Sequence, residues 1–393
     1  MIRAGTGYST ATNAHTAAIE ATTAALKQAG LRTADCAMVF ASTAYGGAYP
    51  LIVRSVAEAA GTREIAGCGS IGVIAGGREF EAGPSIAVLV LGGNSIAATR
   101  LFVPQLRGRS REVAEVIATT VRPHLGTNNL LCLFPDTYNL DPEPLIATLA
   151  RELPGVTVIG GGATEDGSVG ETFQFCGDVV SSNAVAGMLL AGDFTIDLGA
   201  ANACAPLGPT HRVTAVRDNI ILELDGRRAW DVFAEAAGPL AGDLPRALAF
   251  VFVGIPLTPG ADRIGRGNFY VRNITGASSE HGVIAVAYRP KLGDTIGFVL
   301  RDGERSRSEL KATLAAMADR LAQPPAFGLY FDCVSRGSGL YGIPDHDSAY
   351  IGQALGQVPI AGFFTGFEIG PMGDRTGLLQ YCGVLALISD ESA

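Results

Sequence analysis

Residues 327–333 read Phe-Gly-Leu-Tyr-Phe-Asp-Cys, an apolar run that ends in two small polar residues. A short apolar run bounded by polar residues predicts a buried β-strand. The same pattern occurs twice earlier, where residues 37–40 lead into Ser42 and residues 130–134 lead into Asp136. After each run the sequence predicts a helix, a second strand that ends at glycine, a glycine-rich loop and a third strand. The chain therefore contains three repeated strand-helix-strand-strand units.

The spacing within these units supports the repeat. A phenylalanine closes each first strand and a glycine closes each second strand, at intervals of 27, 26 and 31 residues; these pairs are Phe40 and Gly67, Phe134 and Gly160, and Phe331 and Gly362. A strand-helix-strand unit with so short a crossover is predicted to be parallel and right-handed. Both strands of a unit then end at the same edge of the sheet.

The region between the second and third units has a different pattern. Residues 211–225 predict a β-hairpin that turns at Asp218-Asn219, followed by a helix over 227–237. Four runs with turn residues between them predict antiparallel strands over 247–253, 268–275, 282–289 and 295–301, and an amphipathic helix is predicted over 307–321. The fold class is therefore α/β, with mixed β-sheets flanked by helices. We expect two domains, residues 1–220 and residues 221–393.

Ligands of open α/β sheets bind in the loops that follow the carboxyl ends of the strands. The sequence places a set of polar and reactive side chains in those loops: Ser42, Thr43, Cys68, Ser70, Asp136, Thr137, Thr164, Cys333, Arg336, Thr365 and Glu368. Glu368 stands out, because it is the only charged residue of the aromatic and glycine-rich stretch 362–371. A carboxylate in such surroundings needs a cationic or hydrogen-bonding partner, or it becomes protonated. We expect Glu368 and Arg336 to lie together on one wall of a pocket, near Cys333 and Thr365.

Arg272 is a further candidate for ligand contact. Alternation along residues 268–275 places it on the same face as Tyr270 and Ile274. An arginine among apolar neighbours on a strand either extends to solvent or is buried with a carboxylate of the protein or the ligand. The sequence leaves both alternatives open.

Composition and charge exclude several classes of function. Of the 393 residues, 48% are hydrophobic and 17% charged, and the formal net charge is −9. An acidic protein repels phosphate backbones and anionic lipids, so we expect neither nucleic acid nor a membrane surface as a partner. No signal peptide is recognisable, and the seven cysteines form no Cys-x-x-Cys pair. We therefore expect reduced thiols in the cytoplasm.

Common cofactor motifs are weak or missing. Residues 67–72 match the Gly-x-Gly-x-x-Gly pattern, but Gly76-Gly77 follows almost at once and leaves no room for the helix that would bind a pyrophosphate. The five histidines are widely separated in the sequence. We therefore expect neither a metal nor a haem group.

The residues carry a resemblance to the FIST family over nearly the whole chain. Residues 67–72 resemble the Gly-Cys-Ser-Thr-x-Gly-Glu loop of the FIST N-terminal domain. Several later segments are similar to the FIST C-terminal domain, namely residues 220–226, 269–274, 299–302, 333–337, 362–371 and 381–387. The resemblance implies a sensory domain that binds a small polar or carboxylated ligand such as an amino acid. Val73 stands where the family's first loop carries glutamate, so this chain keeps only the C-terminal acid, Glu368.

From the strand-end positions and the alternation around Arg272 we predict a ligand site formed by Ser42, Cys68, Ser70, Arg272, Cys333, Arg336, Thr365 and Glu368. Since the two FIST-like halves account for the whole length, a sensor of this kind would signal through a separate protein partner. Two alternatives stay open. One is a haem-linked gas sensor. The other is a thiolase-like acyl-transfer enzyme with Cys68 or Cys333 as the nucleophile, which would need a histidine base. The ligand's identity and the oligomeric state are not determined by the sequence.

Overall fold

The computed structural model describes residues 1–391, which divide into two compact units. The first unit, which we call the repeat body, contains residues 1–200, residues 311–378 and the chain from Cys382 onward. The second, the inserted unit, contains residues 201–310 together with residues 379–381. The predicted domains, residues 1–220 and 221–393, are each one continuous stretch of sequence. The two compact units instead alternate along the chain.

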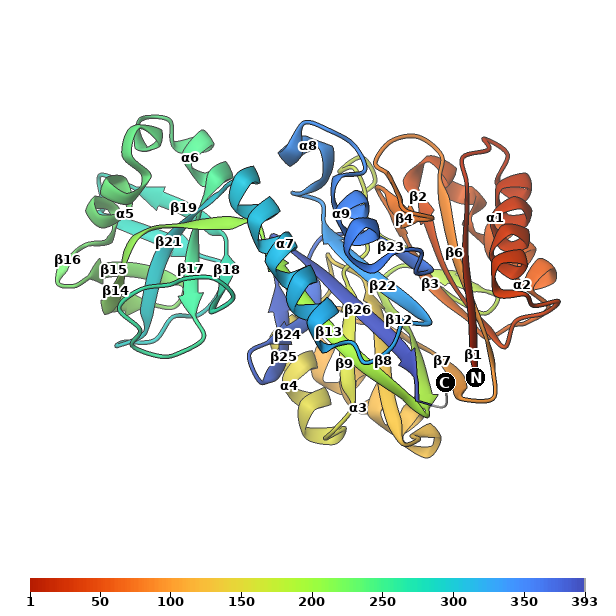
Figure 1. Ribbon diagram of the computed structural model, residues 1–393. Coiled ribbons are helices and arrows are strands. Elements are labelled where there is room, and N and C mark those ends of the chain that lie inside the picture. Colours follow the sequence, from red (N-terminus) through yellow and green to blue (C-terminus); the bar gives the residue numbers. More distant parts are fainter. Residues whose placement is uncertain (392–393) are drawn as a thin grey trace. The chain divides into compact units, whose positions relative to one another are not determined.

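Three repeats build the repeat body, as the sequence predicts (Figure 1). Repeat 1 comprises β1 (Ile2–Ser9), α1 (Ala14–Ala29), β2 (Cys36–Ser42), α2 (Tyr49–Ala60), β3 (Ile65–Ser70) and β6 (Ile86–Gly93). Repeat 2 comprises β7 (Ile96–Pro104), α3 (Ser110–Val121), β8 (Asn128–Pro135), α4 (Pro142–Glu152), β9 (Thr157–Gly161) and β12 (Ala184–Gly192). Repeat 3 comprises β13 (Phe194–Asn202), α7 (Gly303–Arg320), β22 (Phe327–Cys333), α9 (His346–Leu355), β23 (Ile360–Thr365) and β26 (Cys382–Asp390). The repeating sequence pattern does not reveal the first strand and helix of each repeat, because it begins at the second strand.

Each repeat also contains a short hairpin that the sequence analysis interpreted as a glycine-rich loop. The hairpins are β4 (Val73–Ala75) with β5 (Arg78–Phe80), β10 (Gln174–Cys176) with β11 (Val179–Ser181), and β24 (Glu368–Met372) with β25 (Arg375–Leu379). A two-residue turn joins the strands of each hairpin and begins with a glycine at positive φ: Gly76, Gly177 or Gly373. Glycine is favoured there because a side chain is strained at that backbone conformation.

The three sheets have the same strand order, and each includes a hairpin from another repeat. The orders are β1-β6-β2-β3-β10-β11, β7-β12-β8-β9-β24-β25 and β13-β26-β22-β23-β4-β5. The hairpin of repeat 2 therefore completes the sheet of repeat 1, that of repeat 3 completes the sheet of repeat 2, and that of repeat 1 completes the sheet of repeat 3. The exchange is cyclic, so no repeat forms its full sheet alone.

Within each sheet the predicted strand pair is parallel, namely β2 with β3, β8 with β9, and β22 with β23. The strand that closes each repeat runs antiparallel to the first of these. The paired strands therefore end at one edge, where the sequence analysis expected the functional side chains. The shared phenylalanines also meet, since the ring centroids of Phe40 and Phe134 are 5.3 Å apart and those of Phe134 and Phe331 are 6.3 Å apart.

The shared glycine has a steric cause. A Cβ at Gly67, Gly160 or Gly362 would lie 1.6–1.9 Å from a backbone carbonyl oxygen of the neighbouring strand. In every repeat this oxygen belongs to the residue before the shared phenylalanine, namely Val39, Leu133 or Tyr330. The phenylalanine and glycine that reveal the repeat therefore belong to one close contact between two strands.

Most of the inserted unit lies in the chain between β13 and α7, and it forms one antiparallel sheet with two helices. Its strands are β14 (Cys204–Arg217), β15 (Ile220–Leu224), β16 (Arg227–Arg228), β17 (Val251–Pro256), β18 (Phe269–Arg272), β19 (Ile274–Ser278), β20 (Val283–Val286) and β21 (Thr295–Arg301). Their order is β18-β17-β21-β14-β15-β20-β19, with β16 on β15. Its helices are α5 (Ala229–Ala237) and α6 (Leu244–Phe250). The predicted hairpin turn at Asp218-Asn219 is confirmed.

Two predicted strands of the inserted unit differ from the structure. The run 247–253 is a strand only from Val251, because residues 244–250 form α6. The side chain of Asp243 accepts a hydrogen bond from the backbone N–H of Arg246 and caps this helix, and a proline occupies its first turn. The run 268–275 is divided at Asn273 into β18 and β19, which pair with different strands.

We predict that Gly362→Ala destabilises the protein by about 1–3 kcal/mol, because the added methyl group collides with a backbone oxygen that cannot rotate away. Gly352→Ala in α9 is the matched control, since nothing lies within 4 Å of the position that its added methyl group would occupy. Urea unfolding of both variants measures the difference. Equal stabilities for Gly362→Ala and wild type would contradict the steric explanation.

Candidate functional site

A group of buried ionisable side chains lies where the strands of repeat 3 end, and we call it the carboxyl cluster. It consists of Glu79, Asp332, Arg336, Asp347 and Glu368. Asp332 is the penultimate residue of β22, Arg336 precedes α8 (Gly337–Tyr341), and Asp347 is in the first turn of α9. Glu368 begins β24, whereas Glu79 comes from β5 of repeat 1 through the hairpin exchange. All five are at most 5% exposed, and Arg336 is 1% exposed.

Arg336 is the cation at the centre of the cluster. Its Nε lies 2.6 Å from Asp332 Oδ1, and its Nη2 lies 2.5 Å from Asp347 Oδ2. Asp347 also accepts a hydrogen bond from the hydroxyl of Tyr330 at 2.7 Å, and its other oxygen lies 2.8 Å from His346 Nδ1. A buried guanidinium is stable only when it is paired and its donors are satisfied. Asp347 is the carboxylate that meets this need.

The two aspartates of the cluster have opposite pKa shifts. Burial opposes the ionisation of Asp347, but the Arg336 guanidinium and the hydrogen bonds from His346, Arg336 and Tyr330 hold its pKa well below the usual range. Burial raises the pKa of Asp332 well above its ordinary value, and Arg336 offsets this only in part. The same guanidinium therefore favours the ionised form of Asp347 more than that of Asp332.

Glu368 is fully buried and hydrogen-bonded. The Thr365 hydroxyl donates to Glu368 Oε1 at 2.6 Å, and the backbone N–H of Cys382 donates to Oε2 at 3.3 Å. Burial raises the pKa of Glu368 to about 8, although the bonds from Thr365, Cys382 and Cys333 and the charge of Arg336 lower it. Glu368 is therefore not an acid of a solvent-exposed loop.

Glu79 completes the cluster from the opposite side. The backbone N–H of Ser348 donates to its Oε1 at 2.6 Å. Burial, with the nearby charge of Asp347, raises the pKa of Glu79 to about 7. Among the described residues, Glu79 Oε2 and Asp332 Oδ2 are buried oxygens with no hydrogen-bond partner. The cluster thus contains more carboxyl groups than its one guanidinium can neutralise.

The structure brings together four of the residues singled out in the sequence. Arg336 and Glu368 belong to the cluster, and Thr365 and Cys333 contact Glu368 directly. Ser42 and Ser70 are equally buried but use their hydroxyl groups elsewhere. Ser42 Oγ accepts from the backbone of Ser85, and Ser70 Oγ lies 2.7–3.0 Å from oxygens of Gly72, Thr164 and Phe364. These two serines hold strand-end loops in place.

Cys68 and Arg272 have different surroundings. Cys68 is fully buried in β3, and burial raises the pKa of its thiol well above the ordinary value. Arg272 lies in the inserted unit on β18 and is 7% exposed. Its Nη1 donates to the carbonyl of Val271 at 2.8 Å, and its guanidinium lies 4.7 Å from the centre of the Tyr270 ring. The alternative of a solvated Arg272 is therefore excluded.

Sequence reasoning missed Glu79, Asp347 and Tyr330 as members of the site. Asp347 lies in the first turn of a helix, where acidic residues are common because the helix dipole stabilises a negative charge. Its position in the sequence therefore carries no signal of function. Glu79 lay in a segment predicted as a loop, and only the exchanged hairpin places it here. Asp332 had a usable signal, since it directly follows a five-residue apolar strand.

Within residues 1–391, no three His, Cys, Asp or Glu side chains are arranged to hold a metal ion. Over the same residues, no helix has both the length and the apolar character that crossing a bilayer requires. All seven cysteines are buried, and none of them forms a disulfide bond within the described residues.

Comparison with known proteins identifies the family to which this chain belongs. The FIST N domain model matches residues 35–227 and the FIST C domain model matches residues 229–371. The chain belongs to the FIST family, whose domains are in general sensory and ligand-binding. The two matched ranges meet near residue 228, where the chain is inside the inserted unit.

Individual relatives cover the chain from end to end. An uncharacterized protein of Mycobacterium tuberculosis (strain ATCC 25618 / H37Rv) is 29% identical over 391 residues, which is 99% of this chain and 100% of the relative. An uncharacterized protein of Mycobacterium bovis is 29% identical over 393 residues, with the same coverage. Among solved structures, cyanuric acid hydrolase from A. caulinodans aligns over 100% of both chains with 10% identity and a TM-score of 0.41.

We predict that Arg336→Met destabilises the protein by about 3–5 kcal/mol, because Asp347 would lose its buried counter-charge. Arg63→Met serves as the control, since the pair of Arg63 with Asp178 is exposed and such pairs contribute about 0–1 kcal/mol. Denaturant midpoints report both effects. A loss below about 1 kcal/mol for Arg336→Met would show that the cluster does not depend on its cation.

The pKa of Glu368 predicts a pH dependence of stability. The folded protein keeps the Glu368 proton up to about pH 8, whereas the unfolded chain releases it near 4.5. Because the native state binds more protons in this window, stability falls as pH rises from about 5 to 8, by up to about 1.4 kcal/mol per pH unit for one group. Glu368→Gln should reduce this slope, while Glu171→Gln, at an exposed loop position, should leave it unchanged. If stability depended on pH equally in wild type and Glu368→Gln, the raised pKa of Glu368 would be contradicted.

Proposed function

We propose that this protein is a small-molecule-binding sensor whose ligand is a small polar metabolite with an amino group, of the amino-acid class. The carboxyl cluster receives the amino group. The single observation that carries the proposal is the excess of buried carboxyl groups over the one guanidinium. Strongly shifted pKa values in one place favour a functional site over a purely structural one.

An ammonium group supplies what the cluster lacks. Asp347 already neutralises Arg336, so Asp332, Glu79 and Glu368 are kept in or near the protonated form by burial. An ammonium ion has three donors and one positive charge. In the cluster it would hydrogen-bond the unpartnered oxygens of Asp332 and Glu79, and its positive charge would allow the neighbouring Glu368 to ionise.

The cluster favours an amine over a carboxylate as the group that is bound. The Nε and Nη2 of Arg336 contact the oxygens of Asp332 and Asp347. A ligand carboxylate would have to displace one of these and would add a negative charge to an already acidic site. Glu368 therefore acts on the amino group of the ligand through its own carboxyl oxygen. Arg336 fixes the positions of Asp332 and Asp347.

Entry of the ligand requires the segment between β22 and α9, residues 334–345, to move, since the cluster is buried. Ser338 and Asp345 of this segment bind the β5 region, where Ser338 donates to Glu81 and Asp345 accepts from Arg78 at 2.7 Å. The same segment exposes Val334 and Ile343, at 41% and 52%. We infer that its movement reports occupancy to a separate protein partner through these two apolar side chains.

The cysteine-dependent enzyme has no comparable support. Catalysis by a thiol needs a lowered pKa and an accessible sulfur, whereas burial raises the pKa of Cys68. Cys333 is 4% exposed and uses its thiol to contact Glu368. Neither environment resembles that of a nucleophilic thiolate.

The test uses glycine and ethanolamine as probes that carry an ammonium group, with acetate as the matched acid. We expect glycine or ethanolamine to raise the melting temperature. At 100 times the dissociation constant, bound ligand raises the free energy of unfolding by about 2.7 kcal/mol. Acetate should leave the melting temperature unchanged. Calorimetry at pH 7 in two buffers of different ionisation enthalpy should detect proton release, because Glu368 starts protonated and a bound cation favours its ionised form.

Glu368→Gln should abolish the proton release, and Glu171→Gln should not. If acetate stabilised the protein and neither amine did, the ligand would be an acid and the proposal would be wrong. Amine binding with no proton release, unchanged in Glu368→Gln, would place the ligand away from the cluster. Absence of any shift with either amine would remove support for an amine-binding sensor.

A further inference from the structure

The three repeats form three equivalent grooves on the repeat body, each between a helix and the turn of an exchanged hairpin. The helix is α2, α4 or α9, and the facing turn belongs to β10–β11, β24–β25 or β4–β5, respectively. Their volumes are about 620, 470 and 420 Å³. Because the backbone architecture repeats, differences among the grooves come from their side chains.

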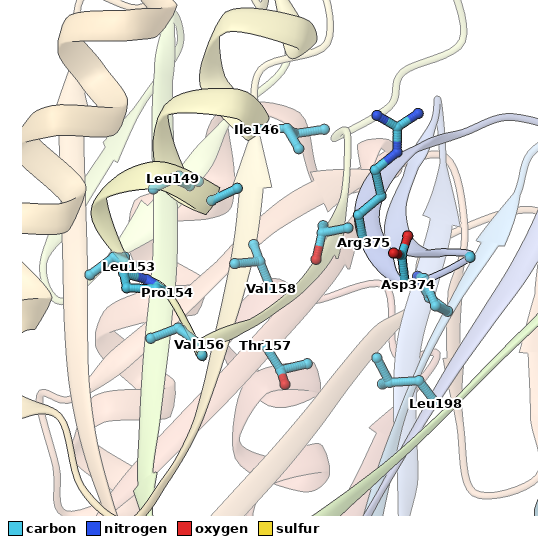
Figure 2. A pocket seen from close by; sticks show the side chains of 15 residues that line it. Ile146, Leu149, Leu153, Pro154, Val156, Thr157, Val158, Leu198, Asp374 and Arg375 are labelled. Atoms are coloured by element: carbon cyan, nitrogen blue, oxygen red, sulfur yellow. The ribbon is translucent and has the colours of Figure 1, made fainter. Parts of the chain in front are cut away.

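The groove of repeat 2, which we call the α4 groove, is the apolar one. Leu149 of α4 and Leu153, which directly follows this helix, form one wall. Val156, just before β9, and Val158 of β9 form the floor, and Leu198 of β13 closes one end (Figure 2). By contrast, the α2 groove is lined mainly by charged residues, and the α9 groove largely by glycines and small polar residues. A concave apolar site of this size is typical of small-molecule binding, for which pockets are roughly 300–1,000 Å³.

The charges at the hairpin turns distinguish the α4 groove further. In the β4–β5 hairpin, Arg78 pairs with Asp345 at 2.7 Å, and in the β10–β11 turn, Asp178 pairs with Arg63 at 3.5 Å. Arg375 occupies the position of Arg78 in the β24–β25 hairpin, directly after the two-residue turn. Among the residues that the structure describes, no ion pair or side-chain hydrogen bond is formed by Arg375, which lines the groove and is exposed (Figure 2).

We propose that the α4 groove binds a small amphipathic carboxylic acid, with its apolar body among the leucine and valine side chains and its carboxylate on the Arg375 guanidinium. Guanidinium and carboxylate match in a bidentate geometry that an alcohol cannot provide and that an amine opposes. Burying the apolar body supplies the larger part of the affinity, at roughly 25 cal/mol per Å² removed from water. Arg375 selects the charge of the head group.

This site is separate from the carboxyl cluster, since none of its lining residues belongs to that cluster. It therefore goes beyond the proposed function and takes a ligand of the opposite charge. Both sites nevertheless involve the β24–β25 hairpin, because Glu368 begins β24 and Arg375 begins β25. A ligand in the groove would contact the hairpin that carries Glu368.

The experiment measures binding of octanoate to the full chain by calorimetry, with octylamine and 1-octanol as probes that share the apolar body. We expect saturable binding of octanoate and weaker binding of both comparison compounds. Arg375→Ala should weaken octanoate binding about tenfold, as loss of a charge-assisted contact at a partly exposed site implies. Ala150→Trp, on the exposed face of α4 that borders the groove, should block it sterically.

Arg54→Ala, on the equivalent helix α2 in the charged groove, is the matched control and should leave octanoate binding unchanged. Failure of octanoate to bind at millimolar concentration, equal binding of octylamine, or an unchanged affinity in Arg375→Ala would each overturn the proposal. So would tighter binding of L-leucine that is weakened by Asp374→Asn, since the groove would then bind a zwitterion. Circular dichroism of each variant confirms that a lost affinity does not reflect unfolding.

Discussion

The exchange of hairpins among the three repeats is the constraint on which the rest of the repeat body depends. A sheet edge that is left unpaired exposes a row of backbone donors and acceptors, and each hairpin satisfies such a row on a neighbouring repeat. Because the exchange is cyclic, the three repeats must be present together. Residues 203–302 are tolerated between β13 and α7 because that connection takes no part in the exchange. The inserted unit therefore interrupts repeat 3, whose β13 precedes it in the chain and whose α7 follows it.

The same exchange creates the carboxyl cluster. Glu79 belongs to repeat 1, yet it accepts a hydrogen bond from Ser348 of repeat 3 because β4–β5 completes that repeat's sheet. Burying several acids beside one arginine is costly unless their protons are retained, and the raised pKa values of Glu79, Asp332 and Glu368 show that this is how the cost is limited. We expect such a site to release a proton when it binds a cation. Its chemistry follows directly from its burial.

The repeats share a backbone plan but differ in the chemistry of their strand ends. Ser42, Asp136 and Cys333 are equivalent positions two residues after the shared phenylalanine. Ser42 and Asp136 both accept a backbone hydrogen bond from the residue or segment just before the closing strand, whereas Cys333 contacts Glu368. The first two repeats therefore use this position for structure, and the third uses it to complete the cluster. A comparable divergence separates the α4 groove from its two counterparts.

The sequence by itself determined the three repeats, their parallel strand pairs and the gathering of Cys333, Arg336, Thr365 and Glu368 at one edge. These follow from local pattern, since a phenylalanine and a glycine at fixed spacing mark a contact between adjacent strands, and parallel strands end together. Only the tertiary structure decided which carboxylates Arg336 binds, that Glu79 joins them, and that Ser42, Ser70 and Cys68 are buried in other surroundings. Those outcomes depend on pairing between segments hundreds of residues apart. The spacing of hydrophobic residues and the choice of turn residues depend only on nearby positions in the chain. They therefore do not specify which sheet a short hairpin will join.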